Sequence, residues 1–148
     1  MSWVGNVIAA VGALEIGKSN QKLYNEQAAL NREKARARRE VFEKIERPRL
    51  VKQQERAYAD TFVGLLKSGV EIRPDTTPFF VLQDIRVNQA TDLAIADYNI
   101  AVDAIDRENQ SLLLQAKGQQ AYSQGLLVAA SEGAKAISGY QEAQKDKG

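Results

Sequence analysis

Uninterrupted helix-forming sequence is the feature that most constrains the fold of this chain. Only three prolines occur among 148 residues. Between Lys18 and Glu46 there is neither Pro nor Gly, and most residues are polar and strongly helix-forming. Pro48 must kink or end this helix, because proline lacks a backbone N–H and clashes with the preceding turn. Helical periodicity then resumes, so the sequence predicts an all-α protein whose first arm covers residues 18–67.

A second interruption follows the first arm. Ser68 and Gly69 predict a C-terminal helix cap, and the Pro-containing segment 68–78 predicts a turn. Thr77 is the expected N-cap of the next helix, with Pro78 at its first helical position. The turn leads into a second arm over residues 79–117, and the two arms predict a long helical hairpin within a single elongated helical domain, 1–148.

Small residues dominate both ends of the chain. Residues 1–17 and 118–143 each predict a short helix, and 144–148 a polar tail. In both helices small residues recur at every fourth position, which predicts a smooth face that another helix can approach closely. The predicted helix-packing or membrane-contact residues are Gly5, Ala9, Ala13, Gly17, Gly125, Ala129 and Gly133.

The N-terminal segment has two interpretations. It is a poor signal peptide, because it lacks a basic start and a clear cleavage site. It is also shorter than the roughly 20 residues that a spanning helix needs. It is therefore either a short buried helix in a soluble oligomer or a segment that enters a bilayer once several copies associate.

Apolar residues on both arms are spaced by three, four or seven residues, which predicts narrow seams for packing on neighbouring helices. On the first arm the seam consists of Leu23, Leu30, Ala37, Val41 and Ile45. The predicted oligomer seam on the second arm consists of Tyr98, Val102, Ile105, Asn109 and Leu112. A polar residue such as Asn109 in a seam either fixes the register and subunit number or faces a wet interface.

A basic cluster lies within the first arm, and its members are Arg32, Lys34, Arg36, Arg38 and Arg39. Such a cluster can contact DNA phosphates or an acidic protein surface. Glu33 and Glu40 flank it and no aromatic residue is interleaved, so a solvated helix face is the favoured interpretation. DNA contact remains an alternative.

The chain has neither His nor Cys, which removes the usual general base, the commonest metal ligand and the thiolate nucleophile. We therefore expect a structural protein rather than an enzyme, with no cofactor and no metal site. The net charge of +1 conceals a basic first half and an acidic second half. This division favours antiparallel self-docking or stacking between copies, and so a homo-oligomer.

The turn and the second arm resemble a known family over roughly residues 60–140. The resemblance rests on Ser68-Gly69-Val70, Phe80-Val81-Leu82-Gln83-Asp84, Asp92-Leu93-Ala94-Ile95, Tyr98-Asn99, Arg107-Glu108-Asn109-Gln110, Ala116-Lys117-Gly118 and the Ala/Gly-rich tail. The family is that of the small internal virion (core) proteins of short-tailed, podovirus-type phages, often called internal virion protein B.

The resemblance implies a location and a role. Proteins of this family are stored inside the capsid near the portal, together with larger internal virion proteins. They leave the particle ahead of the DNA and are thought to help form a channel across the host outer membrane, which would place them in that membrane or the periplasm after ejection. The alternative is a purely structural helical adaptor or ring subunit of a portal or tail assembly, with no membrane role.

Overall fold

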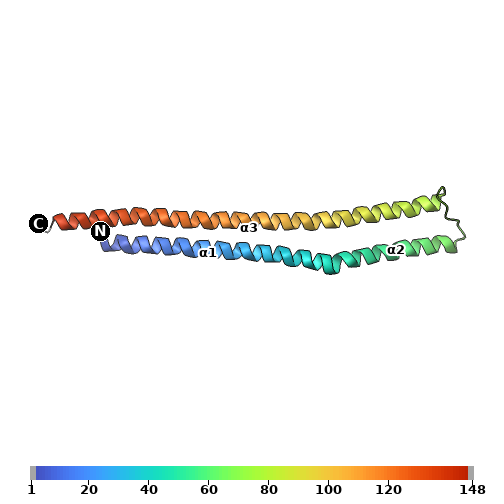
Figure 1. Ribbon diagram of the computed structural model, residues 1–148, viewed down its shortest axis with the longest axis horizontal. Helices are drawn as coiled ribbons and strands as arrows, with labels where there is room; N and C mark the ends of the chain where they lie inside the picture. The colour runs from blue at the N-terminus through green and yellow to red at the C-terminus, as the bar shows by residue number, and fades with distance from the viewer. Residues whose placement is uncertain (1–2, 147–148) are drawn as a thin grey trace. The chain divides into compact units, whose positions relative to one another are not determined.

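The computed structural model describes residues 3–146, and every regular element in this part of the chain is helical (Figure 1). The elements are α1 (Trp3–Val41), the π-helix η1 (Phe42–Glu46), α2 (Arg47–Lys67) and α3 (Thr77–Lys145). The two longest helices, α1 and α3, contain 39 and 69 residues. The predicted all-α class with two long helices is confirmed.

The two short terminal helices that we expected are not separate elements. Helix α1 continues through residues 17 and 18, and α3 continues through residues 117 and 118. A glycine inside a helix costs only about 1 kcal/mol relative to alanine. Gly17 and Gly118 therefore do not end a helix whose neighbouring residues favour it.

The irregularity that we expected at Pro48 lies just before it. The Arg47 N–H donates to the Phe42 carbonyl, five residues back, at the end of η1. Proline cannot donate a backbone hydrogen bond and crowds the carbonyl four residues earlier, which here belongs to Lys44. The widened π-helical turn lies around that carbonyl, and Pro48 itself falls in the first turn of α2, where it is tolerated.

Helix α2 ends in a Schellman cap. Gly69 has φ +76°, and no other residue of the described chain has a positive φ. The Gly69 N–H donates to the Leu66 carbonyl (3.1 Å), and the Val70 N–H donates to the Leu65 carbonyl (3.3 Å). These two bonds satisfy carbonyls that the helix end leaves without a partner.

Helix α3 begins one residue earlier than the expected N-cap implies. The Thr76 carbonyl accepts the first helical bond from the Phe80 N–H (3.3 Å), so Thr76, rather than Thr77, is the capping residue. Its Oγ1 accepts from the Arg73 N–H (3.1 Å) and donates to the Arg73 carbonyl (2.8 Å). The hydroxyl thus closes the turn instead of capping the helix, and Pro78 moves to the second helical position.

The chain divides into two compact units, Met1–Glu33 with Arg107–Gly148, and Lys34–Asp106. Within each unit the segment that precedes the turn lies antiparallel beside the segment that follows it (Figure 1). The buried apolar residues of the described chain are Ala28 and Ala136 in the first unit, and Phe42 and Leu82 in the second. Each unit therefore has only a narrow line of buried contact.

We predict that Gly69→Ala lowers the free energy of unfolding by about 1 kcal/mol, because an L-residue is strained at this φ. A Cβ at Gly69 would meet no atom within 4 Å, so the loss measures backbone strain alone. Gly64→Ala is the matched control: this α2 glycine is equally open, and alanine should raise stability by about 0.5–1 kcal/mol. Urea unfolding followed by circular dichroism measures both. Equal effects of the two substitutions would contradict the assigned cap.

Candidate interaction surfaces

Two glycines bring the helical segments of the first unit into backbone contact. A Cβ added to Gly125 would lie 2.9 Å from the Gly17 Cα and 2.9 Å from the Ala13 carbonyl oxygen. A Cβ added to Gly17 would lie 3.1 Å from the Gly125 Cα. Both glycines are buried. The two small-residue stretches of the sequence therefore pack against each other at this point.

The same line of contact continues along α3 at Gly118. This residue is buried, and an added Cβ would lie 3.2 Å from the Tyr24 Cβ. Further along, Ser111 is fully buried, and its hydroxyl donates to the Ala28 carbonyl at 3.1 Å. In the other direction, an added Cβ at Gly139 would lie 3.5 Å from the Trp3 Cβ.

Ser111, Gly118, Gly125 and Gly139 are separated by seven or fourteen residues, and we call them the inner seam of α3. A seven-residue spacing keeps small residues facing one neighbouring helix. A four-residue spacing instead turns by about 40° at each step, because a helix advances 100° per residue. The signal for the inner seam was therefore present in the sequence at the seven-residue spacing, which the four-residue pattern concealed.

The residues of the four-residue pattern that are farthest from the glycine pair accordingly lie outside the contact. Ala13 and Ala129 are half-buried beside the glycine pair. Gly5 and Ala9 are exposed, and an added Cβ at Gly5 or at half-buried Gly133 would meet no atom within 4 Å.

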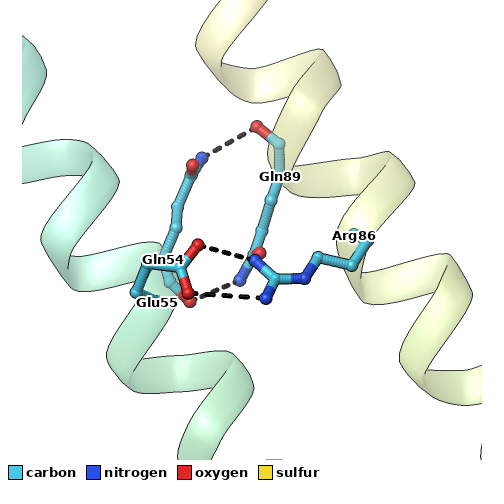
Figure 2. A network of polar contacts seen from close by, with 4 residues as sticks. All are labelled: Gln54, Glu55, Arg86 and Gln89. Carbon is cyan, nitrogen blue, oxygen red and sulfur yellow. Dashed lines mark hydrogen bonds and ion pairs between the residues drawn. The ribbon is translucent and has the colours of Figure 1, made fainter.

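Polar pairs join α2 to α3 in the second unit (Figure 2). The Gln54 side chain donates to the Gln89 carbonyl (2.8 Å), and the Gln89 side chain donates back to the Gln54 carbonyl (2.7 Å). Arg86 donates to both carboxylate oxygens of Glu55, at 2.7 and 3.4 Å. Its guanidinium also lies 3.7 Å from the centre of the Tyr58 ring.

These pairs specify which residues of α2 and α3 face each other. The hydrogen bond from Arg86 holds the pKa of the Glu55 carboxyl below its usual value, and the same bond raises the pKa of Arg86. A second fork joins Arg47 to Asp97, at 2.9 and 3.2 Å. Exposed ion pairs add little stability, so we assign them the role of fixing the register.

The predicted oligomer seam of α3 lies mostly away from the partner segment. Tyr98, Ile105 and Leu112 are 68%, 56% and 52% exposed. Asn109 is also exposed and Val102 is half-buried. The intrachain contact therefore does not use this seam, and its large side chains remain available.

Four residues of this face in the second unit form what we call the outer stripe of α3: Val87, Ala94, Tyr98 and Ile105. All four are exposed. Five positions before each of them lies a less exposed residue of α3. We call the face formed by these four residues the inner face: Leu82, Gln89, Leu93 and Ile100. Five residues correspond to about 140° around a helix. The segment of α3 in this unit therefore carries a second apolar face, roughly opposite the first.

The first-arm seam is also turned away from the intrachain contact. Leu23 and Leu30 in the first unit are 51% and 49% exposed, and Val41 and Ile45 in the second are 43% and 62% exposed. Ala37 is likewise exposed. The pattern that predicted packing thus marks surface that the described chain leaves uncovered.

All five residues of the basic cluster are exposed. Arg38 donates to Glu46 at 2.6 Å, which raises the pKa of its guanidinium. Arg32, Lys34, Arg36 and Arg39 make no ion pair within residues 3–146.

Within residues 3–146, no group of three or more His, Cys, Asp or Glu side chains is placed to hold a metal ion. None of the helices formed by these residues has the length and apolar character needed to cross a membrane.

Comparisons with protein-family models, with curated proteins and with solved structures return no match to this chain.

We predict that Gly125→Ala lowers the free energy of unfolding by about 1–3 kcal/mol, because the added methyl group must push two backbones apart. Gly133→Ala is the matched control, since its Cβ meets open space and alanine favours the helix. Thermal unfolding by circular dichroism measures the pair. A Gly125→Ala protein as stable as the control would show that α1 and α3 do not make this contact.

Proposed function

We propose that this chain is a non-catalytic structural subunit of a multi-copy helical assembly, and specifically an internal core protein of a short-tailed phage. The observation that carries the first part is the distribution of apolar side chains. Twenty-seven large apolar residues of the described chain are exposed, whereas only four apolar residues are buried. A monomer in water would leave these exposed side chains without a partner.

The arrangement of these side chains supports assembly more strongly than their number does. Scattered exposed apolar residues are normal on any protein. Here they follow helical spacing on the outer stripe of α3 and on the first-arm seam. A regular stripe on a long helix is the geometry by which helices pack against further helices.

The phage assignment rests on the resemblance of residues 60–140 to the internal virion proteins. Under this proposal the chain is stored near the portal with the larger internal proteins, and after ejection it helps to form the channel across the host outer membrane. A subunit that exchanges contacts between two settings needs surface that its own fold leaves open, and both helical arms have such surface.

The purely structural alternative, an adaptor or ring subunit without a membrane role, is favoured by one observation. Gly17 and Gly125, two of the candidate membrane-contact residues, pack on each other. In that setting the small residues serve only contacts between helices. The vesicle experiment described below separates the two functions.

We predict that Tyr98→Ser with Ile105→Ser weakens self-association at least tenfold. Each substitution removes an exposed apolar side chain whose burial contributes about 1.5–3 kcal/mol, and 1.4 kcal/mol corresponds to tenfold. Asn88→Ser with Asn99→Ser, at two exposed positions that directly follow Val87 and Tyr98 of the outer stripe, is the control and should assemble as the original chain does. Sedimentation velocity over a range of concentrations measures both, and circular dichroism verifies the helix content. An original chain that remains monomeric at high concentration would refute the assembly function.

The ejection function makes a further prediction. Purified protein should release dye from vesicles made of outer-membrane lipids, and Gly125→Ala, by loosening the helix pair, should change the rate. Assembly in solution without any release would favour the structural adaptor. Phage particles with Leu at Ala9, an exposed position, extend the test: particles that lack the protein indicate a role in assembly, and full particles that fail to deliver DNA indicate a role in ejection.

A further inference from the structure

The two segments of the second unit carry opposite charge. Its segment before the turn, Lys34–Lys67, contains ten Lys and Arg against five Asp and Glu. Its part of α3, Thr77–Asp106, contains one Arg against five Asp. The intrachain forks Arg47–Asp97 and Arg86–Glu55 use only part of this charge.

The remaining charges lie on exposed surface. On α2, Arg49, Lys52 and Arg56 are exposed and make no ion pair within the described residues. Their spacing of three and four residues places them on one face. Lys52 lies five residues after Arg47, whose side chain contacts α3. This basic face of α2 therefore points away from the α3 of its own chain.

On α3 the corresponding acidic residues are Asp84, Asp92 and Asp106. They are exposed, and none makes an ion pair within the described residues. They lie on one flank of α3, about 60°, 140° and 100° around the helix from the outer stripe. The outer stripe itself contains a shallow apolar hollow. Val87, Ala90, Thr91, Ala94, Ile95 and Tyr98 line this hollow.

We propose that the outer stripe of α3 docks against the basic segment Lys34–Lys67 in the second unit of another copy of this chain. The apolar hollow of one copy would receive apolar first-arm side chains of the next, such as Val41 and Ile45, which are 43% and 62% exposed. The acidic segment of α3 would then lie along the basic segment Lys34–Lys67 of the next copy, which includes the basic face of α2. Opposite charges on the two surfaces favour this pairing and disfavour like-on-like pairing.

The two surfaces are different, so the contact is heterologous. Each copy offers one surface of each kind, and the contact therefore repeats from copy to copy, closing into a ring or continuing as a stack. This inference rests on the proposed assembly function and specifies which surfaces perform it.

A charge-swap experiment tests the pairing. One variant carries Arg49→Glu, Lys52→Glu and Arg56→Glu, and the other carries Asp84→Lys, Asp92→Lys and Asp106→Lys. Each alone places like charges across the contact and should weaken self-association at least tenfold in low salt. An equimolar mixture should recover assembly, because each variant then meets a surface of opposite charge. Sedimentation velocity measures association, and circular dichroism verifies that each variant is helical.

The outcomes separate the proposals. One set of outcomes begins with an original chain that assembles. If each variant alone then assembles equally well, or if the mixture does not recover, the proposed pairing is overturned and the assembly function is left intact. If only the variant with Lys at positions 84, 92 and 106 loses self-association, the pairing is also overturned, because α3 would then pair with α3. If a charge-reversed variant is not helical, Arg49→Gln, Lys52→Gln and Arg56→Gln replace the first set, with weakened association expected and unchanged association contradicting the pairing. A monomeric original chain would instead refute the assembly function.

Discussion

The close approach of two backbones at Gly17 and Gly125 is the contact on which the first unit depends. A Cβ at Gly125 would lie 2.9 Å from backbone atoms of α1, so even alanine forces the helices apart. Small residues at seven-residue spacing extend this approach to Gly118 and Ser111, where a hydroxyl satisfies a backbone carbonyl. The stability of this pairing comes from backbone proximity and close packing, because the interior offers almost no large side chains.

The second unit buries the large side chains of Phe42 and Leu82, yet it also leaves apolar side chains uncovered. Val87, Tyr98 and Ile105 of α3 are exposed on the face roughly opposite its partner segment. Polar pairs such as Gln54 with Gln89 meanwhile fix which residues of α2 and α3 meet. A helix pair with a specified register and uncovered apolar faces has the properties of an assembly subunit. This is the physical basis for proposing a structural role, whereas the proposed virion setting rests on the family resemblance alone.

Helical class and the long helices followed from the sequence, because helix propensity accumulates over long windows free of Pro and Gly. The small-residue contact was only partly visible: Gly17 and Gly125 belonged to the predicted set, but the four-residue spacing also selected Gly5 and Ala9, which turn away from the contact. The π-helical turn before Pro48 and the shift of the cap to Thr76 depend on individual hydrogen bonds. Composition and periodicity do not specify such bonds.

The central claim is that α3 carries two faces that belong to different interfaces, one within the chain and one between copies. The chain contains no cysteine, so Leu82→Cys and Val87→Cys each introduce a single thiol, at positions that are 5% and 57% exposed. Thiol-labelling rates measured over a dilution series test the claim directly. We expect position 82 to stay protected at every concentration, whereas position 87 is protected only when the protein is concentrated. Position 87 reacting at one fast rate throughout, or position 82 becoming reactive on dilution, would contradict the claim.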